Sequence, residues 1–256
     1  MFQIIRNWLD RRIIERSTIT PSQWSAAFAA LPLLDGLVED EKRRLRELAI
    51  LFLDRKAIEG AHELAVTQSM ALIIALQACL PILELGLACY DGWSTVIVYP
   101  SGFAPERVVT DEYGVEHRVR DELAGEAWQR GPVILAWDET EYAGYVDGNN
   151  LVIHEFAHKL DMQNGEANGF PPLNREMDPN AWTRAFSAGF DDFQQRCRIG
   201  DHIDINCYGA SSPAEYFAVL SEVFFERPDL LRRHYAAVYE QMRQFYRQDP
   251  LNGMTP

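Results

Sequence analysis

The chain has 256 residues, and 24 lysines and arginines against 38 aspartates and glutamates give it a formal net charge of −14. This length allows one large domain or two small ones with a sizeable buried core. Hydrophobic residues make up 47% of the chain, which indicates a globular protein rather than a disordered one. The strong acidity argues against direct binding of nucleic acid, which needs a basic surface.

The sequence contains no segment typical of export or membrane insertion. The first sixteen residues, MFQIIRNWLDRRIIER, lack the uninterrupted apolar core of a secretory signal. Gln77, Pro81 and Glu84 break the longest apolar run, residues 70–88, so it falls short of the roughly 18–20 residues that cross a bilayer. We therefore expect a soluble cytoplasmic protein that does not contact membranes.

The cysteines show no paired spacing such as CxxC. In a chain of this size and expected location they are read as reduced thiols rather than as a disulfide framework. The four are Cys79, Cys89, Cys197 and Cys207.

The predicted elements fall into two parts. Residues 1–88 are rich in helix formers and show no alternation typical of strands. The segments 94–100, 112–120 and 131–139 then carry strand signals, and GYVDGNN (144–150) has the composition of a turn. Helices are predicted afterwards, over 151–160, 180–196, 213–226 and 228–247. The order indicates an α+β fold, with a helical N-terminal portion (1–90) followed by a domain (91–256) that contains a small mixed sheet.

His154-Glu155-Phe156-Ala157-His158 matches the pattern HExxH. On a helix, residues four apart lie one turn apart on the same face, so both imidazoles can reach one zinc ion. Glu155 stands beside them and can take a proton from a water at the metal. The pattern therefore predicts a zinc site with His154 and His158 as ligands and Glu155 as general base.

The surroundings of the motif favour a buried helix. Asn149 or Asn150 can cap its start, and Gly165 can end it. Residues 151–160 are apolar nearly all round, and a charged glutamate in such a helix is costly unless it has a partner or a role. The alternative is a chance match, with two core histidines and an unrelated glutamate.

A catalytic zinc site needs a third protein ligand and an open position for water. The extended motif with a third histidine fails, because Asn164 and Asp161 stand where a histidine and a glycine are needed. A glutamate followed by an aspartate four residues later also fails, because Val219 holds that place after Glu215.

The segment 211–228 offers a later helix with two candidate ligands. Glu215 and Glu222 are seven residues apart and share one helical face. Glu215 could instead serve only as the capping-box partner of Ser212. The residues alone do not decide which of the two glutamates is the third ligand. The glutamate that is not the ligand, or Asp161, could accept a proton from a ligand histidine.

At these residues the chain resembles the bacterial Mlc titration factor family of zinc metallopeptidases. The resemblance covers most of the chain from about residue 90. It depends on GPVILAW, LVIHEFAHKLD, NGEANGFPPL and YGASSPAEYFAVLSEVFF. The family is similar in turn to the catalytic domain of anthrax lethal factor, in which a tyrosine precedes the ligand glutamate by seven residues.

Tyr208 and Glu215 stand in that relation here. The resemblance therefore implies a zincin-like domain with Glu215 as third ligand and Tyr208 as the group that stabilises the oxyanion. It also implies aminopeptidase-like activity on a peptide or protein substrate, and binding to the glucose-responsive transcription repressor Mlc, which belongs to sugar phosphotransferase regulation. The alternative is a repressor-binding protein without catalytic activity. Its zinc would be structural, and Cys207 could supply the fourth protein ligand.

Two further expectations concern the substrate. The strand GPVILAW could lie along the cleft and pair with an extended peptide. The segment 110–148 carries ten acidic and three basic residues and directly precedes the metal helix. Asp138, Glu139 or Glu141 is therefore expected at the rim of the cleft, where it would favour a cationic substrate.

Overall fold

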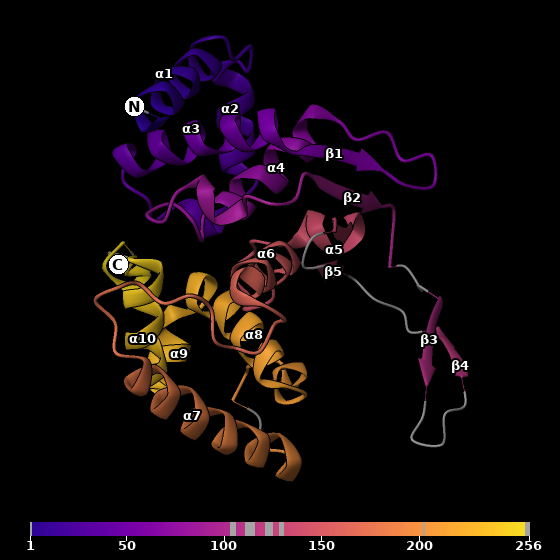
Figure 1. Cartoon of the computed structure of the whole chain (residues 1–256), viewed down its shortest axis with the longest axis vertical. Helices are drawn as coiled ribbons and strands as arrows, with labels where there is room; N and C mark the ends of the chain where they lie inside the picture. Colours follow the sequence, from indigo (N-terminus) through magenta and orange to yellow (C-terminus); the bar gives the residue numbers. More distant parts are fainter. Residues whose placement is uncertain are drawn as a thin grey trace.

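The computed structural model describes residues 2–102, 106–110, 116–120, 125–127, 131–201 and 203–253. Helices at the N-terminal end, a small sheet and a group of C-terminal helices follow one another, with α6 in the middle (Figure 1). The N-terminal helices are α1 (Phe2–Glu15), α2 (Pro21–Ala29), α3 (Glu39–Arg55) and α4 (Gln68–Cys79), with short 3-10 turns η1 (Pro32–Leu34) and η2 (Leu87–Tyr90). The expected helical character of this portion is largely confirmed.

The main sheet has the strand order β1-β2-β6-β5. Strands β1 (Ala57–Gly60), β2 (Thr95–Tyr99) and β6 (Val133–Ala136) run parallel, and β5 (Gly125–Ala127) pairs antiparallel with β6. The valines of β2 at positions 96 and 98 are fully buried, as expected for alternate residues on the inner face. The mixed sheet is therefore confirmed, with β5 at its edge within the described residues.

Two expectations about the strands were wrong. β1 lies in the N-terminal portion, where only helices were expected, and it pairs with β2 from Ala57↔Thr95 to Gly60↔Val98. The segment GPVILAW contributes β6, which has neighbours on both sides and so cannot pair with a further chain. The division of the chain at residue 90 stays a prediction.

A separate two-stranded sheet pairs β3 (Glu106–Thr110) with β4 (Glu116–Arg120) in antiparallel orientation. Figure 1 shows it extending away from the rest of the molecule. The expected strand over 112–120 is confirmed for its second half, and residues 111–115 lie outside the described residues.

The C-terminal part is helical, as expected. It contains α5 (Trp137–Tyr142), α6 (Leu151–Asp161), α7 (Pro179–Ile199), α8 (Pro213–Glu226), α9 (Pro228–His234), α10 (Ala236–Tyr246) and α11 (Pro250–Gly253), with 3-10 turns η3 (Met162–Asn164) and η4 (Cys207–Ala210). The helix expected over 228–247 is two helices, because Tyr235 leaves the helical conformation. Its hydroxyl donates to Asp192 and its ring packs on Phe193 and Tyr216, so tertiary contacts override local helix propensity there.

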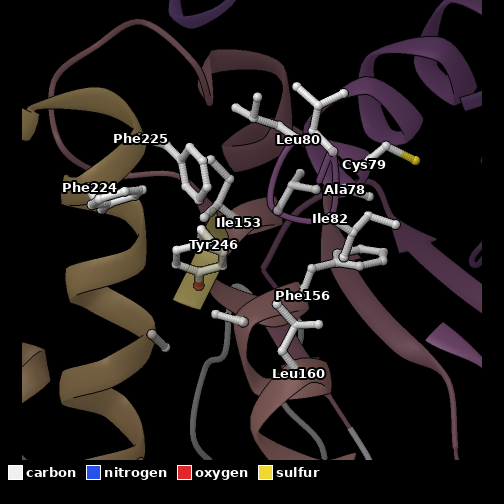
Figure 2. Close-up of a cluster of buried hydrophobic side chains, with 14 of the residues drawn as sticks. Ala78, Cys79, Leu80, Ile82, Ile153, Phe156, Leu160, Phe224, Phe225 and Tyr246 are labelled. Carbon is white, nitrogen blue, oxygen red and sulfur yellow. The ribbon is translucent and has the colours of Figure 1, made fainter. Parts of the chain in front are cut away.

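Helix α6 is held on two sides by apolar packing. Figure 2 shows Ile153, Phe156 and Leu160 of α6 among side chains from the end of α4 and from the C-terminal helices. Each of these three side chains is fully buried, which stabilises the fold by about 1.5–3 kcal/mol per residue. The packing fixes the place of the helix that carries the HExxH residues. Within the described residues, no helix is long and apolar enough to cross a bilayer.

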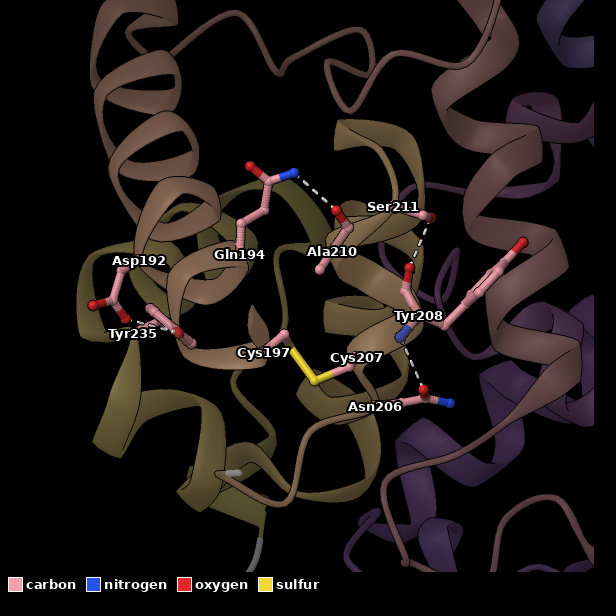
Figure 3. The surroundings of a disulfide bond; sticks show 9 residues. All are labelled: Asp192, Gln194, Cys197, Asn206, Cys207, Tyr208, Ala210, Ser211 and Tyr235. Carbon is pink, nitrogen blue, oxygen red and sulfur yellow. Dashed lines mark hydrogen bonds between the residues drawn. A yellow bond between two sulfur atoms is a disulfide. The ribbon is translucent and has the colours of Figure 1, made fainter. Parts of the chain in front are cut away.

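The expectation that all cysteines are reduced was wrong for one pair. Cys197, near the end of α7, and Cys207, at the start of η4, form a disulfide with their Cα atoms 5.8 Å apart (Figure 3). Gln194 Nε2 donates to Ala210 O at 2.9 Å across the same two elements. The bond requires α7 and η4 to lie side by side, which a ten-residue sequence spacing does not reveal. Cys79 and Cys89 are free thiols.

Candidate metal centre

Helices α6 and α8 pack against each other and run in opposite directions. Asn150, the cap of α6, and His154 and His158 stand at every fourth position on one face of α6. They face three carboxylates of α8, those of Glu215, Glu222 and Glu226. This contact brings the HExxH residues to the helix in which the third ligand was expected.

Three donor atoms converge at the middle of this contact. Glu215 Oε2 lies 3.0 Å from His154 Nε2 and 3.3 Å from His158 Nε2, and the two nitrogens are 3.2 Å apart. Donors at 2.0–2.1 Å from a tetrahedral zinc ion are separated by about 3.3 Å, so the triangle matches the spacing that zinc requires. In the described part of the chain these are the three residues whose His, Cys, Asp or Glu donors cluster in this way.

Glu222 holds His154 from the other side of the ring. Its Oε1 lies 2.7 Å from His154 Nδ1, so a hydrogen on Nδ1 would leave Nε2 available to bind a metal ion. The structure therefore separates the two glutamates, with Glu215 at the Nε2 atoms and Glu222 at the orienting position. Ser212 Oγ accepts from the Glu215 N–H at 3.1 Å, while the Glu215 carboxylate faces the histidines.

Asp161 was the other residue considered for orienting a ligand histidine, but its carboxylate bonds backbone N–H groups instead. Its Oδ2 accepts from the N–H groups of Asn168 and Gly169, both at 2.7 Å. Asp161 Oδ1 and His158 Nδ1 are buried without a hydrogen bond to any residue that the structure describes.

Protonation of the centre follows from these contacts. Burial favours a neutral His154 ring, but hydrogen bonds to Glu215 and Glu222 outweigh it and raise the pKa of His154 well above its usual value. Burial also opposes a charged Glu215, yet its bonds to the two histidines lower the pKa of this carboxyl to about 2. A metal ion binding here would replace a proton, as at other sites with imidazole ligands.

Glu155 lies on the cleft side of α6 and is only 4% exposed. Burial raises the pKa of its carboxyl to about 7, although the neighbouring His154 and His158 partly oppose this shift. Glu155 Oε2 makes no hydrogen bond to the residues described. On its other side is Gly125 of β5, where a Cβ atom would lie 2.4 Å from Glu155 Oε1. The edge strand therefore approaches this carboxylate as closely as a glycine permits.

Tyr208 is brought to the same place by η4. Its ring centre lies 5.9 Å from that of His154, and the side chain is 52% exposed. Asn206 Oδ1 accepts from the Tyr208 N–H at 3.0 Å, and Figure 3 shows the ring pointing away from the disulfide. Because Cys207 Sγ is bonded to Cys197, it is not available as a metal ligand.

A cleft of about 500 Å³ is lined by His154, Glu155 and Glu222, together with Gly125 and Tyr208. Among the described residues that line it there is no lysine or arginine, and four are acidic: Glu139, Asp147, Glu155 and Glu222. Of the acidic rim residues expected from the sequence, Glu139 lies in the cleft, whereas Asp138 and Glu141 are exposed elsewhere. Parts of the acidic segment, 111–115, 121–124 and 128–130, lie outside the described residues.

Glu226 was not identified from the sequence as a buried hydrogen-bond acceptor beside the site. This carboxylate is 1% exposed and accepts hydrogen bonds from Gly144, Gly148 and Asn150. The signal was present, because Glu226 follows Glu222 by four residues on the same helical face.

Comparison with known proteins agrees with the motif. The family model described as glucose-regulated metallo-peptidase M90 matches residues 5–247 and so includes the N-terminal portion. The chain is 40% identical to Mlc titration factor A of Serratia proteamaculans over 235 residues, which are 91% of this chain and 89% of that protein. It is 36% identical to Mlc titration factor A of Escherichia coli over 245 residues, or 95% of this chain and 92% of that protein. The chain therefore belongs to the glucose-regulated metallo-peptidase M90 family.

Proposed function

We propose that this chain is a zinc-dependent peptidase with a zincin-like catalytic domain. In this proposal His154, His158 and Glu215 hold Zn²⁺, Glu155 is the general base, and Tyr208 stabilises the oxyanion. The observation that carries it is the triangle of 3.0–3.3 Å between the three donor atoms, beside a buried carboxylate and an open cleft. The family assignment supports a metal-dependent peptidase but leaves the roles of single residues to experiment.

The chemistry of the residues follows from their places. A bound zinc ion would supply Lewis acidity and make a water more acidic. Glu155, with a pKa near 7, can take a proton from the attacking water and pass it to the leaving amine. Tyr208, at the cleft wall beside His154, can donate its hydroxyl hydrogen to the oxygen of the carbonyl under attack. Glu222 orients the His154 ring through Nδ1, so that Nε2 would be available to hold the metal.

The substrate would lie against the edge of the sheet. β5 borders the cleft through Gly125 and is the last strand of the sheet within the described residues. An extended peptide could add to this edge by backbone hydrogen bonds and so pass its carbonyl in front of Glu155. Glu139 and Asp147 would favour a substrate with a free amino terminus or a basic side chain, consistent with aminopeptidase-like activity.

Metal content and hydrolysis test the proposal together. The wild-type protein should bind one zinc ion, and a chelator should abolish hydrolysis of peptide anilides until zinc is restored. Glu215→Ala should lose the ion under conditions in which the wild type keeps it. Glu222→Ala is the matched change on the same helix and should weaken zinc binding less. If the Glu215→Ala variant kept its zinc while Glu222→Ala lost it, the ligand assignment would be wrong.

A second candidate function is capture of a transcription repressor in the cytoplasm. It is favoured by the relatives, which carry the name Mlc titration factor A. The net charge of −14 is compatible with this role, because the partner would be a protein rather than DNA. If repressor binding survives a chelator that stops hydrolysis, the two functions are separable. If hydrolysis is absent with zinc bound, repressor capture remains as the function to pursue.

A further inference from the structure

A buried carboxylate behind the cleft has no place in the chemistry described above. Glu226 stands one turn beyond Glu222 on α8 and is 1% exposed. A buried carboxylate is costly unless hydrogen bonds or a cation compensate it. Within the described part of the chain Glu226 forms no ion pair, and three N–H groups surround it instead.

These three donors belong to one short segment, residues 144–150. Glu226 Oε1 accepts from Gly144 N at 3.0 Å and from Asn150 Nδ2 at 2.9 Å, and Oε2 accepts from Gly148 N at 2.9 Å. Both carboxylate oxygens are therefore used, and the bonds close the segment around the side chain. Gln77 Oε1 accepts a second hydrogen bond from Asn150 Nδ2 at 2.8 Å.

The segment needs such support because its backbone is strained. Val146 has φ of 64°, a conformation unfavourable for a β-branched residue. Gly144 and Gly148, with φ of 90° and 96°, adopt conformations that glycine reaches without strain. No side chain of the segment other than that of Asn150 reaches Glu226, so backbone N–H groups do most of the anchoring.

The same segment forms one wall of the cleft. Asp147, Asn149 and Asn150 line it, and so do Tyr142 and Ala143, which immediately precede the segment. Asn150 also caps α6 by accepting from Ile153 N at 3.0 Å, and its own N–H donates to Glu222. Glu226 therefore joins the cleft wall to the start of the metal helix without touching the metal ligands.

We propose that Glu226 is a positioning residue for substrate: its carboxylate fixes the segment 144–150 as a wall of the cleft at a constant distance from the metal centre. The inference rests on the proposed peptidase function. It gives the two neighbouring carboxylates different roles: Glu222 orients a metal ligand, and Glu226 orients the segment 144–150, which forms the cleft wall.

Glu226→Gln is the direct test, because the amide keeps the shape but offers one acceptor oxygen in place of two. At least one donor of the segment then faces an NH₂ group. In zinc-loaded enzyme we expect KM for a peptide anilide to rise about tenfold, which corresponds to ~1.4 kcal/mol, while kcat stays within about twofold. The zinc dissociation constant should stay within about threefold.

Glu222→Gln is the matched control, with the same substitution one turn away. It should raise the zinc dissociation constant about 10- to 100-fold, as loss of a group that orients a ligand does elsewhere. The proposal is overturned if Glu226→Gln leaves KM unchanged, or if it weakens zinc binding as much as Glu222→Gln does.

Amide hydrogen exchange provides a readout that needs no turnover. The N–H groups of Gly144 and Gly148 should exchange about tenfold faster or more in Glu226→Gln, and those in the middle of α6 should not. Glu226→Asp keeps the charge on a shorter side chain and should give a smaller change in exchange rate in the same direction. It provides the same test if Glu226→Gln folds poorly. Unchanged exchange at both glycines in a folded variant would refute the anchoring.

Failure of the proposed peptidase function can be distinguished from failure of the inference about Glu226. If the zinc-loaded wild type hydrolyses nothing, that function falls, and the role of Glu226 is then decided by binding of an alanine-rich hexapeptide. Because that protein does not turn the peptide over, binding can be measured directly with and without the Glu226→Gln change. Binding weakened about tenfold by Glu226→Gln supports the inference, and equal binding with and without that change overturns it.

Discussion

The close approach of β5 to Glu155 makes Gly125 a sensitive position. A Cβ atom at Gly125 would lie 2.4 Å from Glu155 Oε1, 2.7 Å from Glu155 Cδ and 2.7 Å from Leu151 Cδ1. A Cβ atom does not approach nonbonded atoms this closely, so Gly125→Ala must displace the carboxylate or the strand. We predict that the variant keeps its zinc and loses most of its peptidase activity.

The size of the effect follows from the displacement. Ordinary contact begins near 3.4 Å, so the Glu155 carboxylate has to move by about 1 Å if the strand stays in place. A misplacement of about 1 Å in a catalytic group can cost on the order of 10²-fold in rate. We therefore expect kcat to fall about 10²-fold, with a zinc dissociation constant within about threefold of the wild-type value, because Glu155 is not a ligand.

The assay is hydrolysis of a peptide anilide by zinc-loaded protein, with zinc content measured on the same samples. Ala127→Gly is the matched control, because it also alters a small residue of β5 but adds no atom near Glu155. Its kcat should stay within about threefold of the wild-type value. Wild-type kcat in a folded, zinc-loaded Gly125→Ala variant would refute the placement of Glu155 against the edge strand.

Three other predictions concern Tyr208, the disulfide and a buried lysine. Tyr208→Phe should lower kcat by about 10²-fold with KM and zinc content unchanged, as for loss of one oxyanion donor, and an undiminished kcat would remove the tyrosine from the mechanism. Cys207→Ser should lower the free energy of unfolding in urea by about 3 kcal/mol under oxidising conditions, because the ten-residue link to Cys197 is lost; equal stability would mean that the bond is not formed in solution. Burial lowers the pKa of Lys56 to about 8 from an ordinary 10.5, so between these pH values the unfolded chain holds the proton that the folded one has released. Wild-type stability should therefore rise by about 2 kcal/mol from pH 8 to pH 10.5 relative to Lys56→Met, and parallel curves in urea titrations would contradict this.

The parts of the site that could be predicted from the sequence are those with a helical period. The four-residue spacing of His154 and His158 and the capping position of Asn150 follow from helix geometry alone. The seven-residue spacing of Glu215 and Glu222 places both on one face, but which of them faces the Nε2 atoms of the histidines depends on how far α8 is shifted along α6. That shift is a property of packing, so it appears only in the structure.

The features that were missed depend on contacts between distant segments. β1 has four residues and includes Glu59 and Gly60, a composition that does not favour a strand until β2 lies beside it. The Cys197–Cys207 bond requires α7 and η4 to lie side by side. The break at Tyr235 depends on Asp192 and on rings of α7 and α8. Each of these is decided by tertiary contacts that outweigh local propensity.

The central claim is that Glu155 acts as general base beside a zinc ion held by His154, His158 and Glu215. The most direct measurement is peptide hydrolysis by Glu155→Gln with its zinc content determined in the same sample. The amide keeps the shape of the side chain but cannot accept a proton from water, so the variant should bind one zinc ion and lose at least about 10²-fold in kcat. Full activity in a variant that contains its zinc would contradict the account.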